Sequence, residues 1–393
     1  MTTAIPIAAV LGAAIVVSLN VGKLPPALPL LREEFGLGLV GASLLVSLFQ
    51  LAGMLLGLFG GMLADRFGPR RVMRIGLVAA AAGCAGGALA PGIGTLLASR
   101  AIESAGFILT VLPGPALIAR GVAPARLKAA MGLWGTYMPA GMALGLVLSP
   151  PVFEAAGWRA AWWAIAAASI AMAALLGRAV APDAAGHAAV GARALVLDTL
   201  RSPRPWVLAA AFGCYAGQWI GVFSFLPTLY VESGVALAVA GGLTAAGVAV
   251  NVLGNLAAGA LLHRGTARAT LIAAASVAMA AGAWLCFGSG APFPLRYAGV
   301  LLFSTVGGMI PATLFATTAA YAPHPRAVST TTGLMQQGST LGQFVAPPLV
   351  AAVATAAGGW HLTAWATGAM AVGTLACAWA IARFERADAA ARR

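Results

Sequence analysis

The chain has 393 residues, of which 61% are hydrophobic and only 8% are charged. Soluble domains carry about 25% charged residues, so this composition excludes a soluble globular protein and indicates a membrane protein. A formal net charge of +13 could indicate a nucleic-acid partner, but the distribution of the basic residues along the chain argues against one.

Apolar stretches of about 20 residues or more, the length that a spanning helix requires, recur along the whole chain. In chain order they lie at about 5–29, 37–64, 72–91, 94–119, 127–153, 158–180, 204–231, 236–262, 268–289, 294–321, 327–355 and 359–383. The first is too long for a signal peptide and lacks a basic segment before it, so we interpret it as a spanning helix. Because helices satisfy their own backbone hydrogen bonds in lipid, the sequence predicts an all-α membrane protein with twelve transmembrane helices.

Basic residues gather in alternate loops between the predicted helices. With the amino terminus placed in the cytoplasm, most of the 23 Lys and Arg residues fall on the cytoplasmic side, and only Arg32, Arg159 and Arg296 fall outside. This positive-inside bias predicts a multi-pass protein of the inner (cytoplasmic) membrane with both termini in the cytoplasm. Because the basic loops face anionic membrane lipids, the charge needs no nucleic-acid partner.

The second half of the sequence repeats motifs of the first half. Gly61, Leu63 and Arg66 recur 198 residues later as Gly259, Leu261 and Arg264. At the same offset, Leu28-Pro29 reappears as Leu226-Pro227. Six helices per half keep both halves in the same orientation, so the duplication predicts two parallel six-helix repeats.

The longest polar stretch between predicted helices lies at the join of the two halves. We therefore expect an amino-terminal six-helix bundle at 1–180, a cytoplasmic linker at 181–203, and a carboxy-terminal six-helix bundle with a short cytoplasmic tail at 204–393. The linker contains the amphipathic run ARALVLDTLR, which favours one interfacial helix. We expect the protein to be a monomer surrounded by membrane lipids.

The densest charge in the chain lies in GGMLADRFGPRR, residues 60–71. This run resembles the signature loop between helices 2 and 3 of the major facilitator superfamily, and the twelve-helix layout is similar over the whole chain. The matching residues are Gly61, Leu63, Asp65, Arg66, Gly68, Arg70 and Arg71. NVGKLPPALP (20–29) and GLWGTYMPAGMALG (132–145) resemble the cyanate and nitroimidazole permease branch of that superfamily.

The resemblance implies that this loop latches the two halves together on the cytoplasmic side and that its opening exposes the inner face. The implied gate residues are Gly61, Asp65, Arg66, Gly68, Arg70 and Arg71. The chemistry fits such a latch, because a carboxylate is stabilised by helix amino-terminal amides and by Arg side chains. The alternative is that the basic residues only enforce the membrane topology.

Three ionisable residues, Lys23, Arg100 and Glu103, fall inside predicted helices. A central Lys or Arg costs about 2.5–3.5 kcal/mol on insertion scales, so such residues usually have a partner or a function. Arg100 and Glu103 share a helical face and could form a self-neutralising pair. Lys23 could extend to the outer headgroups, but Pro25 and Pro26 predict that it lies at a helix break facing protein or water.

The three charges sum to +1, which favours an anionic small-molecule substrate. Uncharged polar residues in the matching helices are further candidates for substrate binding or proton relay, with helix–helix hydrogen bonding as the alternative. Those that we select are Asn20, Tyr137, Gln218, Gln336 and Gln337.

We therefore expect a secondary active transporter, not an enzyme, that moves a small anionic solute by alternating access and is coupled to protons. The alternative is a proton-coupled exporter of hydrophobic compounds or drugs. No phosphate-binding loop is present to support ATP-driven transport, and no residue spacing predicts a metal site or another cofactor.

Overall fold

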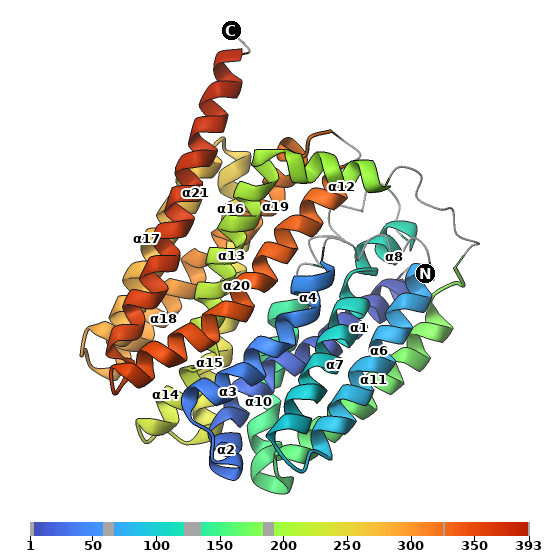
Figure 1. The fold of residues 1–393 in the computed structure, drawn as a ribbon, viewed down its shortest axis with the longest axis vertical. Helices are drawn as coiled ribbons and strands as arrows, with labels where there is room; N and C mark the ends of the chain where they lie inside the picture. The colour runs from blue at the N-terminus through green and yellow to red at the C-terminus, as the bar shows by residue number, and fades with distance from the viewer. Residues whose placement is uncertain are drawn as a thin grey trace. The chain divides into compact units, whose positions relative to one another are not determined.

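The computed structural model describes residues 4–57, 67–121, 134, 136–183, 192–324 and 327–391, and no β-strand occurs in these ranges (Figure 1). Within them, 11 helical segments are long and apolar enough to cross a membrane. A further apolar helix, α6 (Pro69–Ala88), begins with three arginines that lower its mean hydropathy. The predicted all-α membrane fold is therefore confirmed.

Two compact units make up the chain. Unit 1 contains Met1–Ala192 and Phe225–Ala246, and unit 2 contains Arg193–Ser224 and Gly247–Arg393. The predicted division into 1–180, 181–203 and 204–393 differs from this grouping mainly in where it assigns Phe225–Ala246, and it remains a prediction.

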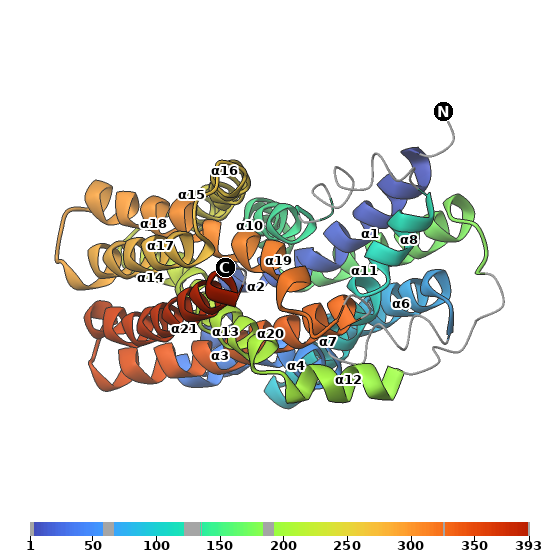
Figure 2. The same cartoon turned by 90° about the horizontal axis from the view of Figure 1, so that it is seen from above.

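Unit 1 is a bundle in which α6 packs along both α7 and α11, while α1 packs along α10 and α11 (Figure 2). Besides α6, its helices are α1 (Ala4–Gly22), α2 (Leu24–Phe35), α3 (Leu39–Ser47), the 3-10 helix η1 (Leu48–Gln50), α4 (Leu51–Leu56), α7 (Ile93–Val111), α8 (Gly114–Gly121), α10 (Tyr137–Ala156), α11 (Trp158–Ala179), α14 (Leu226–Glu232) and most of α15 (Leu237–Ala249). The α1, α6, α7 and α11 helices enclose the charged residues described below.

Unit 2 is built around the long contact between α13 and α20, with α21 packed against α13 and α17. Its helices are α12 (Ala192–Arg201), α13 (Pro203–Phe223), α16 (Asn251–His263), α17 (Arg268–Ala283), the π-helix η2 (Trp284–Gly288), α18 (Phe293–Gly307), α19 (Met309–Tyr321), α20 (Val328–Ala356), the 3-10 helix η4 (Trp360–Leu362) and α21 (Thr363–Ala391). The α12 helix coincides with the run ARALVLDTLR and lies crosswise to α13 (Figure 1).

Candidate functional site

Lys23 is the single residue between α1 and α2. Pro25 and Pro26 follow it, and because proline has no N–H, the carbonyls four residues earlier, on Val21 and Gly22, lose their helical partners. The structure thus places Lys23 at the expected break. Its side chain is completely buried, so it does not extend to a membrane surface.

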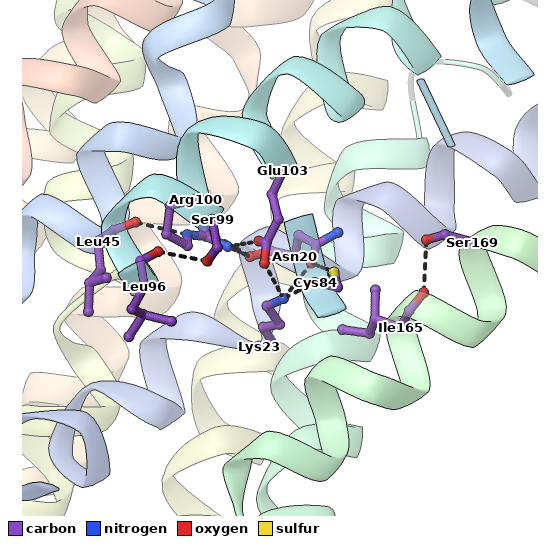
Figure 3. A network of polar contacts seen from close by, with 10 residues as sticks. All are labelled: Asn20, Lys23, Leu45, Cys84, Leu96, Ser99, Arg100, Glu103, Ile165 and Ser169. Atoms are coloured by element: carbon purple, nitrogen blue, oxygen red, sulfur yellow. Dashed lines mark hydrogen bonds and ion pairs between the residues drawn. The ribbon is translucent and has the colours of Figure 1, made fainter. Parts of the chain in front are cut away.

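Lys23, Arg100 and Glu103 form one buried ion-pair network, which we call the triad (Figure 3). Lys23 Nζ lies 3.0 Å from Glu103 Oε1, and Arg100 Nη1 pairs with the other carboxylate oxygen, Oε2. Arg100 and Glu103 lie three residues apart on α7, and Lys23 reaches them from the break after α1. One carboxylate therefore forms ion pairs with both cations.

Backbone carbonyls satisfy the rest of the Arg100 guanidinium. Its Nε donates to the Leu45 carbonyl at 3.0 Å, and Nη1 and Nη2 both donate to the Asn20 carbonyl at 3.3 Å. The guanidinium carbon also lies 4.5 Å from the centre of the Phe49 ring. These contacts attach α7 to α1 and to the α3–η1 segment and fix the orientation of Arg100.

Asn20 and Cys84 complete the surroundings of Lys23. Lys23 Nζ donates to Asn20 Oδ1 at 2.6 Å and lies 3.5 Å from Cys84 Sγ, which itself donates to Asn20 Oδ1 at 3.0 Å. The ammonium also lies 4.0 Å from the centre of the Trp162 ring, where the electron-rich face attracts a cation. The network thus draws on α1, α6, α7 and α11.

The site depends on two small residues that the sequence analysis did not select. A Cβ on Gly83 would lie 2.6 Å from the Glu103 backbone nitrogen, so only glycine lets α6 approach α7 this closely. Ser104 accepts a hydrogen bond from the Ala52 backbone N–H at 3.0 Å. The 3-10 segment η1 ends just before Ala52, so the serine supplies an acceptor where the helical hydrogen-bond pattern changes.

Among the described residues, the buried Lys, Arg, Asp and Glu side chains are those of the triad alone. Two cations and one carboxylate give the interior of unit 1 a formal charge of +1. Such an arrangement can bind an anion, and the carboxylate can accept a proton. Within the same described ranges, no group of three or more His, Cys, Asp or Glu residues is placed to hold a metal ion.

The remaining predicted binding residues lie on α10, α13 and α20, not on the helices that carry the triad. Tyr137 joins an aromatic cluster, with its ring centre 4.8 Å from that of Trp134 and 6.5 Å from that of Phe107. Gln218 on α13, and Gln336 and Gln337 on α20, belong to unit 2. Gln218 is 1% exposed, and its Nε2 finds no hydrogen-bond acceptor in the described part of the chain.

A second polar cluster in unit 2 is neutral. Asn251 Nδ2 donates to the Ser304 carbonyl at 2.9 Å and lies 3.3 Å from the Tyr215 hydroxyl. Asn255 Nδ2 donates in turn to Asn251 Oδ1 at 3.0 Å. This cluster connects α13, α16 and α18 by hydrogen bonds without burying a charge.

The predicted gate loop is described only in part, because Gly61, Asp65 and Arg66 lie outside the described residues. Gly68 has a φ of 86°, a conformation that favours glycine, and it is the N-cap residue directly before α6. The carboxylate of Asp183 accepts hydrogen bonds from the backbone N–H groups of Arg70 at 3.1 Å and Arg71 at 2.9 Å.

Asp183 was not among the predicted gate residues. Its carboxylate caps the positive end of α6 and also lies 3.3 Å from the Arg120 guanidinium. The adjacent arginines hold the end of α11 to α6, since Arg70 donates to the Gly177 carbonyl and Arg74 to the Ala173 carbonyl at 3.2 Å. The sequence signal for Asp183 was weak, because one aspartate in a polar linker is unremarkable without its contact to α6.

A model of the Major Facilitator Superfamily matches residues 10–347 of the chain. The protein belongs to this superfamily. Solved superfamily structures share its fold: a bacterial homologue of the human lysosomal transporter Spinster, in its inward-facing and occupied conformation, superposes with a TM-score of 0.82 at 15% identity and covers 96% of each chain. At this identity the likeness concerns the fold alone.

The sequence relatives are named for different compounds. The cyanate transport protein CynX of Escherichia coli (strain K12) is 30% identical over 246 residues, 62% of each protein, so the chain spans less than two thirds of that relative. The quinolone resistance protein NorA of Staphylococcus aureus (strain MRSA252) is 33% identical over 136 residues, 34% of each protein. The chain is thus a multi-pass membrane protein from a family of transporters of small molecules.

Proposed function

We propose that this superfamily member is a secondary active transporter that moves a small anionic solute by alternating access, coupled to protons. The observation that carries the proposal is the fully buried triad with its net positive charge. Burying an unbalanced cation in a membrane protein is costly, and a negative ligand that compensates the charge during transport would offset this cost. The likeness to a cyanate transport protein supports the same class of substrate.

The setting of this function is also part of the proposal. The protein works as a monomer in the inner membrane with both termini in the cytoplasm, in accord with the basic loops of the sequence. The loop containing Gly61, Asp65 and Arg66 acts with Gly68, Arg70 and Arg71 as the cytoplasmic gate. Access to a binding site near the membrane midplane alternates between the two sides. Asn20 and Tyr137 of unit 1, and Gln218, Gln336 and Gln337 of unit 2, are the further residues that we propose for substrate binding or proton relay.

Uptake into proteoliposomes tests this function. We expect purified protein to accumulate labelled cyanate or another small carboxylate or pseudohalide when the lumen is more alkaline than the outside. Empty liposomes and the variant Lys23→Met, whose triad is formally neutral, should show only background uptake. If no small anion moves under any imposed pH gradient, the proposal is wrong.

Export of hydrophobic compounds is the second candidate, and the partial match to a quinolone resistance protein favours it. A transporter of this kind would bind its substrate through apolar and aromatic side chains, so Lys23→Met should leave it active. Cells that express the protein would then survive quinolones better than control cells, and Lys23→Met would retain that resistance. Loss of cyanate uptake in Lys23→Met without any resistance phenotype supports the anion transporter instead.

A further inference from the structure

Glu103 holds the place in unit 1 that an anionic ligand would occupy. Its two carboxylate oxygens are divided between Lys23 and Arg100, so both cations are engaged by one negative group. Neither cation has another acidic partner among the described residues. A carboxylate-like anion could accept hydrogen bonds from the same two cations, but only if the Glu103 carboxylate were neutral.

Protonation is the simplest way to neutralise the Glu103 carboxylate. Few other titratable groups lie around it. Lys23, Cys84 and Arg100 are the titratable groups that face it from the α1–α2 break, α6 and α7. The α3, η1 and α4 segments contribute no titratable residue. The arginines of α6 lie in its first two turns, and the nearest, Arg74, is ten residues from Cys84, about 15 Å along a helix.

Two further donors around Lys23 have no acceptor. Asn20 Nδ2 and Trp162 Nε1 are buried and find no hydrogen-bond partner within the described residues. The orientation of the Asn20 amide follows from Lys23, because an ammonium can only donate and must therefore face Oδ1. Buried donors without acceptors are costly, and two such donors lie on residues that contact Lys23, beside the two cations that share one carboxylate.

We propose that Lys23, Arg100, Asn20 and Trp162 form a donor cradle for a small monovalent anion, and that Glu103 is the internal anion that the substrate replaces. A proton from the open side forms an O–H bond on Glu103, and the substrate then accepts hydrogen bonds from the four donors. On the opposite side the anion and the proton both leave, and the carboxylate pairs again with both cations. This inference rests on the proposed function and deepens it, since one proton accompanies each anion and the cycle moves no net charge.

Proton and anion counts in wild-type proteoliposomes test the coupling. With labelled cyanate outside and a pH-sensitive dye inside, we expect one proton to enter per cyanate. With no pH gradient, a membrane potential set by potassium and valinomycin should not drive accumulation. Accumulation driven by the potential, or cyanate entry without protons, would overturn the inference while leaving anion transport intact. If neither cyanate nor any other small anion moves, the proposed function itself fails.

The cradle is tested separately by Trp162→Phe, which removes the indole N–H and keeps an aromatic ring beside Lys23. Losing one hydrogen bond to a charged ligand should weaken cyanate binding by about tenfold to a hundredfold, with the proton count unchanged. The matched control is Trp158→Phe, because the Trp158 indole already donates to Glu34 at 2.6 Å. Equal cyanate affinity in Trp162→Phe and wild type would contradict the cradle.

Glu103→Gln tests the internal anion. We expect this variant to exchange labelled for unlabelled cyanate at a rate independent of pH and to lose accumulation driven by a pH gradient. Glu34→Gln, which changes a carboxylate outside the network, should still accumulate cyanate. Retained proton-driven accumulation in Glu103→Gln would overturn the inference, and if the variant does not fold, the wild-type proton count decides alone.

Discussion

The two units bury polar side chains in different ways. Unit 1 encloses three charged groups, whereas the described core of unit 2 contains neutral amides, hydroxyls and thiols. At the repeat offset of 198 residues, Lys23, Arg100 and Glu103 correspond to Gly221, Ala298 and Leu301. Within the described residues, the buried charges therefore lie in the first of the two predicted repeats, and recognition of a charged substrate need not follow the symmetry of the fold.

Two buried side-chain amides, unlike the buried charges, occupy positions that correspond at the offset of 198 residues. Asn20 corresponds to Gln218 at the same offset, and the amide nitrogen of each has no acceptor among the described residues. Unpaired buried donors are uncommon in folded proteins. Asn20 and Gln218 thus share an unpaired buried amide nitrogen at repeat-related positions, whereas the buried cations among the described residues lie in unit 1.

The largest effect that this comparison predicts follows the loss of the carboxylate in unit 1. Glu103→Gln leaves two buried cations without a counterion, and breaking a buried pair in this way costs about 3–5 kcal/mol. Lys23→Met leaves the Arg100–Glu103 pair formally balanced, so it should destabilise the protein less. Thermal unfolding of both variants in the same detergent measures the difference, and a Lys23→Met variant that is less stable than Glu103→Gln would refute this ordering.

A smaller loss is expected from the neutral cluster of unit 2. Asn251→Leu removes the hydrogen bonds to the Ser304 carbonyl and the Tyr215 hydroxyl, each of which contributes about 0.5–1.5 kcal/mol, while the Ser304 carbonyl keeps its bond from the Gly308 N–H. Because no charge is exposed to the apolar interior, the cost should stay below that of Glu103→Gln. Thermal unfolding again provides the measurement. Equal decreases in unfolding temperature for Asn251→Leu and Glu103→Gln would mean that burying charge does not distinguish unit 1 from unit 2.

The contact of Asp183 with the start of α6 should contribute less to the stability of the protein than the neutral cluster of unit 2. Asp183→Ala removes an acceptor from the Arg70 and Arg71 backbone amides, and loss of a helix cap costs about 0.5–2 kcal/mol. Asp198→Ala is the control, since that carboxylate is 48% exposed and lies 3.7 Å from His324. If both variants unfold at the wild-type temperature, Asp183 does not stabilise this end of unit 1.

The smallest effect is expected from the exposed pair between Arg32 and Glu232. Their side chains are 30% and 47% exposed and 3.2 Å apart, and water screens such pairs to at most about 1 kcal/mol. Arg32→Ala should therefore lower the unfolding temperature only slightly. A loss as large as that of Glu103→Gln would mean that burial is not what distinguishes the triad.

Hydropathy and proline placement predicted much of the fold and part of the site. Apolar segments fixed the all-α membrane class, and Pro25 and Pro26 identified the break at Lys23. Spacing along one helix predicted that Arg100 and Glu103 could pair, because residues three apart share a face.

Contacts between distant helices could not be predicted from one sequence. Lys23 meets Glu103 across 80 residues, and Arg70 meets Asp183 across 113 residues. In the sequence, Trp162 and Cys84 are ordinary residues of apolar spanning segments. Only the structure shows that both contact Lys23. Such residues gain their chemical role from packing, which neither periodicity nor composition records.

Ligand-induced stabilisation tests most directly whether the buried cations of unit 1 bind the transported anion. A ligand at 100 times its dissociation constant stabilises a folded protein by about 2.7 kcal/mol, so cyanate should raise the unfolding temperature of the wild-type protein measurably. Arg204→Met, which removes a 31% exposed cation from unit 2, should keep this increase, and Lys23→Met should lose it. An equal increase for wild type and Lys23→Met would contradict the account.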